Sequence, residues 1–350
     1  MAAIMPRDLL SDSLLERLGG PADQAGDPTS LLAGDIAVLA EIGYLNVALP
    51  PEFGGLGCTL RQAACGQRRL AGHAPLTALA ISAHLYWTGA AADAYRAGDN
   101  SVRWILVEAA GGALFAGGHG GTSGEAGEAG GDLRFADPRS RCEPSGENGY
   151  QFRASGVLTS VTPAWDWIAV HAVHQAARPQ TVVAFAGRGT RCTPAFRVAR
   201  VQPVGTPADV FATSALTWGH SLLASVEYSD ARRAFSAAIT EYAEAAASAV
   251  LAGEAGDAVR SVSPPRAAAG HPVGRWPIAE AGTRLDAMKA RIAEITHPWQ
   301  LVQEPTPDLG GQHLIGLYAM RHEVAESAAS VHGLVEQLTG TQRRKSHPVS

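Results

Sequence analysis

The first third of the chain has the apolar period of α-helices. Between residues 31 and 42, apolar side chains recur every three or four positions, at Leu32, Ile36, Leu39 and Ile42. This spacing places them on one face of a helix. Three further helices are predicted over residues 60–71, 75–97 and 101–110. The pattern therefore predicts a helical part that extends to about residue 111.

The middle of the chain changes to the period of β-strands. Tyr150 and Phe152 alternate with polar neighbours, and residues 167–173 and 181–185 are rich in β-branched and aromatic side chains, a composition typical of strands. No helical pattern separates these strands. This arrangement favours an antiparallel sheet or a small barrel.

The last part returns to the helical period in three long stripes. One stripe has apolar residues seven positions apart, as in helices that pack along one seam. Its members are Leu317, Val324, Val331 and Leu338. The other stripes are Phe235, Ile239, Tyr242, Ala246 and Val250, and Ile278, Ala281, Leu285, Met288, Ile292 and Ile295. Three such helices are expected to pack as an up-down bundle or against a partner subunit.

These periods define the predicted fold class, which is α+β and mostly α. An N-terminal helical domain is expected over residues 1–111. A small, incomplete antiparallel β-barrel or sheet domain is expected over 112–205, and a C-terminal helical bundle over 206–350.

Composition narrows the classes of partner. The net charge is −5, so the chain lacks the basic surface that nucleic-acid binding requires. No apolar run reaches the roughly 18 residues that a membrane helix needs, so no membrane partner is expected. The cysteines have no CxxC spacing, which predicts free thiols in a reducing cytoplasm and no metal site. They are Cys58, Cys65, Cys142 and Cys192.

A loop follows the first apolar stripe. Residues 48–57 contain two prolines and three glycines, which exclude a helix interior. Its Pro-x-x-x-Gly-Gly-x-Gly motif resembles the N-terminal signature of the acyl-CoA dehydrogenase family. Residues 113–120, 149–156 and 271–288 are similar to later segments of that family, in the same order. The chain thus resembles a shortened, divergent member of the family.

The resemblance implies an FAD site where the barrel meets the C-terminal bundle, partly built by a neighbouring subunit. FAD would take a hydride from an acyl thioester such as acyl-CoA, while a carboxylate takes the α-proton. Arg275 would pair with a pyrophosphate oxygen. The residues that the resemblance places beside the flavin are Gly117, Gly118, His119, Gly120, Gly121, Thr122, Leu158, Thr159 and Ser160. By composition alone, the glycines could equally form a surface loop, and Arg275 could be a surface residue.

Parts of the family pattern are absent from the sequence. Too few residues lie between Val204 and Ala208 for the roughly two further strands that the family has there. No counterpart of the family's catalytic Glu follows Gly340. Some relatives carry a base on the first helix of the third part, expected here near residues 209–214. Asp209 is the only carboxylate there, and its ordinary role would be a helix N-cap, so no catalytic residue is assigned beyond this weak candidate.

Three functions remain open on these grounds. The first is an FAD-dependent, acyl-CoA dehydrogenase-like oxidoreductase that carries out α,β-dehydrogenation of an acyl thioester, as a homo- or hetero-oligomer with a relative. The second is a non-catalytic partner subunit of a larger acyl-CoA dehydrogenase assembly. The third is a flavin-linked oxygenase on the same fold, which would need no α-proton base. Fold alone does not choose among them.

Overall fold

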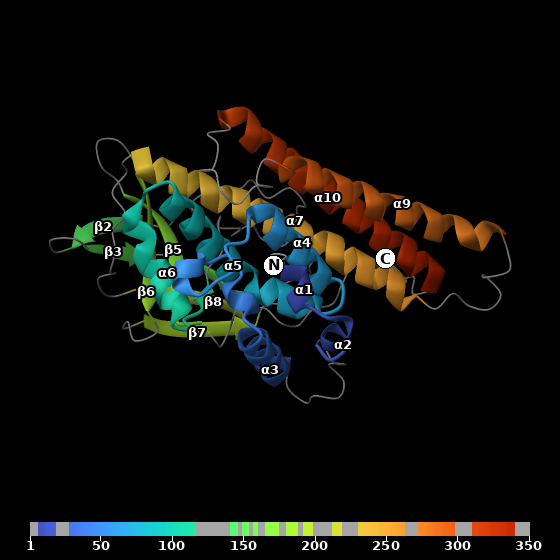
Figure 1. Cartoon of the computed structure of the whole chain (residues 1–350), viewed down its shortest axis with the longest axis horizontal. Helices are drawn as coiled ribbons and strands as arrows, with labels where there is room; N and C mark the ends of the chain where they lie inside the picture. The colour runs from blue at the N-terminus through green and yellow to red at the C-terminus, as the bar shows by residue number, and fades with distance from the viewer. Residues whose placement is uncertain are drawn as a thin grey trace, which may run out of the picture.

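A computed structural model gives the fold of the chain (Figure 1). It describes residues 6–18, 28–116, 141–145, 149–153, 157–159, 165–174, 180–187, 192–198, 212–218, 230–262, 272–297 and 310–339.

The N-terminal part is helical, as predicted. Its helices are α1 (Pro6–Leu9), α2 (Asp12–Leu15), α3 (Pro28–Glu41), α4 (Leu60–Ala71), α5 (Pro75–Arg96) and α6 (Arg103–Ala110). Short 3-10 helices, η1 (Tyr44–Asn46), η2 (Pro51–Phe53) and η3 (Asn100–Val102), join them. Helix α4 begins with a capping box in which Thr59 and Gln62 each satisfy the backbone N–H of the other. Helix α5 begins at Pro75, whose missing N–H needs no partner in a first turn.

The loop between α3 and α4 confirms the prediction from its prolines and glycines, apart from the single turn of η2. Gly54 and Gly57 have φ angles of 80° and 64°, a region that side chains with a Cβ adopt at a cost. A Cβ on Gly55 would lie 2.1 Å from the Leu49 carbonyl oxygen. The glycine pattern therefore reflects backbone conformation and close backbone packing in this loop.

The strands form two sheets. The five-stranded sheet has the order β1-β5-β2-β3, with β6 also paired to β5. The three-stranded sheet has the order β4-β8-β7. The strands are β1 (Phe115–Ala116), β2 (Arg141–Ser145), β3 (Gly149–Arg153), β4 (Val157–Thr159), β5 (Trp167–His174), β6 (Gln180–Gly187), β7 (Cys192–Val198) and β8 (Ala212–Trp218).

Two details differ from the sequence expectation. Most strand pairs are antiparallel, but β5 runs parallel to both β1 and β2. Strand β8 occupies residues 212–218 and pairs with β4 and β7, so strand structure continues beyond residue 205. The expected lack of strands after Val204 was therefore wrong in part, because β8 lies further along the chain. The domain boundaries themselves stay a prediction.

Three long helices follow, as the apolar stripes predicted. They are α7 (Asp230–Ser261), α9 (Pro272–Ile295) and α10 (Gly310–Thr339). Helix α7 packs against α4 and α5 and also against α9 and α10, so it joins the N-terminal helices to the C-terminal pair (Figure 1). Ile278 of the predicted stripe is 38% exposed, and Trp276 and Ile315 are 72% and 67% exposed.

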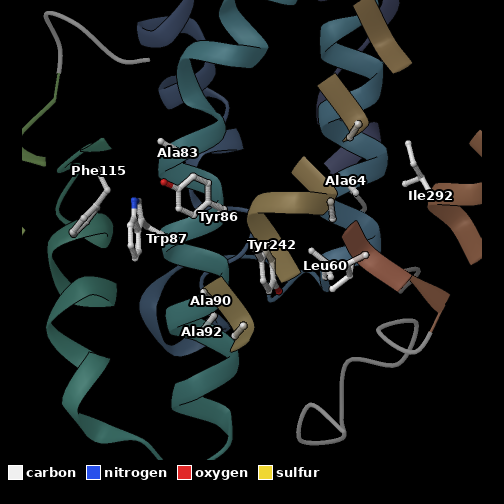
Figure 2. Packing of buried hydrophobic residues seen from close by; sticks show 14 of the residues in the cluster. Leu60, Ala64, Ala83, Tyr86, Trp87, Ala90, Ala92, Phe115, Tyr242 and Ile292 are labelled. Carbon is white, nitrogen blue, oxygen red and sulfur yellow. The ribbon is translucent and has the colours of Figure 1, made fainter. Parts of the chain in front are cut away.

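The core is continuous from the sheet to the long helices. Trp87 of α5 is fully buried and lies edge-on to Phe185 of β6, with 4.9 Å between ring centroids. Tyr242 of α7 lies between residues of α4 and α5 (Figure 2). It packs against Gly89 so closely that a Cβ there would lie 2.2 Å from the Tyr242 ring. The small residues of α5 thus permit the close approach of α7.

Gly89→Ala is expected to destabilise the fold by roughly 1 to 3 kcal/mol, because the added methyl group overpacks a core that has no space for it. Gly282→Ala in α9 is the matched control, since no atom lies within 4 Å of the added Cβ. It should gain about 0.5 to 1 kcal/mol from reduced backbone freedom. Urea unfolding measures both. Equal stabilities would show that α5 and α7 are not packed in this way.

Candidate functional site

A buried histidine holds the strand that leads into the predicted flavin segment. His84 of α5 is 1% exposed. Its Nε2 lies 3.0 Å from the Leu45 carbonyl oxygen, and its Nδ1 lies 3.3 Å from the Phe115 backbone nitrogen in β1. A carbonyl only accepts and a backbone N–H only donates, so Nε2 carries the proton and Nδ1 accepts. Burial lowers the pKa of His84 to about 4, which keeps the ring neutral and both bonds possible.

On the side that faces β5, Leu114, directly before β1, bonds to the residues at the start of β5. The Asp166 carboxylate accepts the Leu114 N–H at 2.9 Å. The Leu114 carbonyl in turn accepts the N–H groups of Asp166 and Trp167, at 2.8 and 3.0 Å. The Trp167 indole N–H also donates to Glu108 of α6, at 3.1 Å. The entry to the sheet is therefore fixed from two sides.

A second group of buried polar residues lies where the end of α5 meets α7. Asp93 of α5 accepts a hydrogen bond from Nη1 of Arg96, one turn further along. Glu241 and Tyr242 approach from α7 and are 5% and 2% exposed. One oxygen of Glu241 and Nη2 of Arg96 are buried without a hydrogen-bond partner among the described residues. Buried polar atoms of this kind are rare in native structures and call for a partner such as water or a ligand.

Burial changes the acidity of the carboxyl groups on α7. The pKa of Glu241 is raised to about 8, first by burial and then by the nearby charge of Asp93. The pKa of Glu244 is raised to about 7 by burial, against the opposing effect of Arg321 on α10, whose Nε lies 3.9 Å away. Glu244 thus has a cationic partner, whereas Glu241 faces a carboxylate that is already paired. A carboxyl group with a pKa near neutrality can both take and release a proton.

Most of the site residues predicted from sequence lie outside the described residues. These are Gly117, Gly118, His119, Gly120, Gly121, Thr122, Ser160 and Asp209. Leu158 and Thr159 form the end of β4, and Arg275 lies in the first turn of α9; their backbones are described, but their side chains are not. The assignment of all ten cofactor-binding residues therefore stays a prediction.

The fold does relate the two predicted flavin segments to each other. The first begins directly after Ala116, at the end of β1. The second segment includes Leu158 and Thr159 at the end of β4. Residues 160–164 connect Thr159 to Trp165, and Asp166 bonds to Leu114, directly before β1. The six Cα–Cα steps from Thr159 to Trp165 span at most about 21 Å. The first segment therefore starts at the anchored strand, and Thr159 of the second lies no further than this from Trp165.

The expected position of a base on the first helix of the third part needs a correction. That helix is α7, which begins at Asp230, because residues 212–218 form strand β8. Asp209 precedes both elements, so the reason given for it as a base no longer holds. The buried carboxyl groups that α7 does carry include Glu241 and Glu244. Their place beside the apolar stripe of Tyr242 was visible in the sequence, but their burial was not.

Comparison with solved structures gives the fold. The chain resembles KijD3 in complex with FMN and a dTDP-linked sugar, with 20% identity and a TM-score of 0.60 over 97% of this chain and 83% of that one. It resembles the HsaA monooxygenase from M. tuberculosis, with 15% identity and a TM-score of 0.66 over 98% and 90%. It also resembles PigA with FAD and proline, with 14% identity and a TM-score of 0.62 over 90% and 80%.

Such identities establish the architecture alone. The chain has the mostly helical α+β fold of acyl-CoA dehydrogenase-like flavoenzymes, and two of the three structures named above contain a flavin. No known protein family matches the sequence, and no curated protein matches it. The narrower identification as a divergent acyl-CoA dehydrogenase stays a prediction.

Three further findings concern metal ligands, membrane helices and cysteines. Among the residues that the structure describes, no three His, Cys, Asp or Glu side chains gather in a way that could hold a metal ion. No helix within the described ranges combines the length and the apolarity needed to cross a membrane. Cys58 and Cys65 are free thiols, as expected.

Replacing Glu241 by glutamine is expected to stabilise the chain increasingly as the pH rises. The folded pKa of about 8 exceeds the ordinary value of 4.5, so the folded state holds a proton that the unfolded state releases. The contribution of Glu241 is thus fully present below pH 4.5 and is lost as the pH rises through 8. Glutamine mimics the protonated form and should gain roughly 2 to 4 kcal/mol over the wild type between pH 5 and pH 9.

The measurement is urea unfolding at both pH values. Glu326→Gln in α10 is the control, since the Glu326 side chain is 70% exposed. If the difference in unfolding free energy between the wild type and Glu241→Gln does not change with pH, the pKa of Glu241 is not raised in the folded state.

Proposed function

We propose that the chain is a flavin-dependent oxidoreductase of the acyl-CoA dehydrogenase fold, with the flavin at the junction between the sheets and the long helices. The observation that carries this proposal is the strand β1, held on one edge by His84 and on the other by Asp166. A segment that leaves a strand fixed in this way has a defined starting point, as a cofactor site requires.

The residues proposed to hold the flavin follow from that anchor. Backbone N–H groups of residues 117–122 would lie along the ring, where glycines permit close approach. Thr159 or Ser160 would donate a hydroxyl hydrogen bond to the ring, and Arg275 would pair with a phosphate oxygen. When bound, a flavin supplies hydride or oxygen chemistry, and the protein orients it.

We further propose that Glu241 is the acid–base residue. Dehydrogenation of an acyl thioester requires a carboxylate to take the α-proton. Glu241 has a buried oxygen without a hydrogen-bond partner among the described residues and a pKa raised to about 8. It is therefore a carboxylate only near and above that pH, where it takes a proton more readily than an ordinary carboxylate, and bleaching by acyl thioester should become faster as the pH rises through 8. Asp93, which is paired with Arg96, lies beside it and adds to its raised pKa. The nearby α7 carboxyl group, Glu244, also has a buried oxygen without a hydrogen-bond partner among the described residues. Because Arg321 lies 3.9 Å from that oxygen and offsets its charge, Glu244 is not assigned this role.

The acyl thioester substrate is the finer part of the proposal, and a flavin-linked oxygenase is the second candidate. The similarity to a structure described as a monooxygenase favours the second candidate. A non-catalytic partner subunit of a larger acyl-CoA dehydrogenase assembly, lacking the catalytic Glu, is the remaining candidate. Association with a second copy or with a relative is proposed as well, supported by the exposed Trp276 and Ile315 on α9 and α10.

Purified protein supplied with FAD or FMN is expected to retain flavin through gel filtration, with the absorption band of a protein-bound isoalloxazine. Addition of an acyl thioester without oxygen should bleach that band if the chain is a dehydrogenase. Oxygen consumption with reduced flavin and a second substrate would instead identify an oxygenase. A chain that stays colourless with both flavins contradicts the enzymatic proposal and favours the partner subunit.

Glu241→Gln is expected to lower the rate of bleaching by acyl thioester by at least about a hundredfold, since general-base catalysis contributes that much. Flavin affinity should be unchanged. The matched control is Glu244→Gln, which removes a buried carboxyl group of the same helix that faces Arg321, and it should keep most of the rate. Equal rates for the two variants would refute the role of Glu241.

A further inference from the structure

We propose that His84 is a positioning residue for the flavin site, which sets the place of β1 by bonding to Phe115 and Leu45 at once. This inference rests on the proposed function and goes beyond it, because His84 lies in the helical part and belongs to neither predicted flavin segment. The contact joins α5, η1 and the first strand of the sheet.

The need for such a residue follows from the position of β1 in the sheet. Strand β1 has two residues and lies at the edge, next to β5. The Leu114 carbonyl bonds to β5, so by strand alternation the N–H of Phe115 points away from β5. An edge N–H that is buried must find a partner outside the sheet. His84 provides that partner and takes the place of a further strand.

The chemistry of the imidazole suits both bonds. One end of the ring must accept from the Phe115 N–H, and the other must donate to the Leu45 carbonyl. Only a neutral ring has one nitrogen of each kind. A glutamine amide can also accept and donate, whereas phenylalanine has a similar shape and can do neither. Substituting His84 by glutamine or by phenylalanine therefore tests the effect of the hydrogen bonds separately from the effect of packing.

The consequence for the flavin is geometric. Ala116 ends β1 and is fully buried, and the predicted flavin segment starts with the next residue. Functional groups must be held within about 0.5 Å of their working position by the residues that support them. Losing the bond at Phe115 releases one edge of this strand, while the Asp166 side remains bonded. The loss is therefore expected to displace the start of the segment without unfolding the sheet.

The test compares His84→Phe, His84→Gln and the control Ile81→Val, for flavin affinity by fluorescence quenching and for the absorption maximum of bound flavin. Ile81 lies on the same helix and is fully buried, but none of the described hydrogen bonds joins it to β1. Its shortening should cost about 0.5 to 1.5 kcal/mol of stability. Thermal unfolding of the three variants shows how much stability each has lost.

We expect His84→Phe to weaken flavin binding by about tenfold or more and to shift the absorption maximum. His84→Gln should restore both values, and Ile81→Val should alter neither. A folded His84→Phe protein that binds flavin like the wild type overturns the inference and leaves the proposed function standing. Failure of the wild type itself to bind flavin overturns both.

Discussion

Helix α5 must satisfy its polar groups inside the protein, because 16 of its 22 residues are buried. Thr88 bonds to the carbonyl of His84 within the helix, at 2.8 Å. His84 and Asp93 instead have partners beyond the regular helical bonds, on β1 and at Arg96. A buried polar group without a partner costs about 1 to 3 kcal/mol, so the His84 contact constrains where the sheet can lie, while Asp93 is satisfied within α5 where that helix meets α7.

The two candidate regions are consequences of that constraint. At the middle of α5, His84 holds the edge strand from which the predicted flavin segment leaves. One to three turns further on, the helix presents Gly89 and Asp93 to α7, so Tyr242 packs closely and Glu241 enters a buried environment. One helix therefore couples the entry of the sheet to the carboxyl group proposed as the acid–base residue.

The architecture is shared with flavoenzymes of low sequence identity, but the chemistry in this chain depends on a few side chains. Helix α7 packs between the N-terminal helices and the α9–α10 pair, so the side chains on its packed faces are buried from solvent. Of its carboxyl groups, Glu244 has the guanidinium of Arg321 nearby, whereas Glu241 lies beside Asp93. The difference between these neighbours, rather than the shared fold, distinguishes the two residues.

The sequence by itself determined the longer helices, the strands β3, β5 and β6, and the order helix, sheet, helix, because apolar period and proline and glycine positions act locally. It predicted α4 over residues 60–71 with the bounds that the structure has. Tertiary structure alone decided that β8 lies beyond residue 205, that β5 has parallel neighbours and that Glu241 is buried. Pairing and burial depend on residues far apart in the chain, so no local pattern around Glu241 could reveal that its carboxyl group is buried.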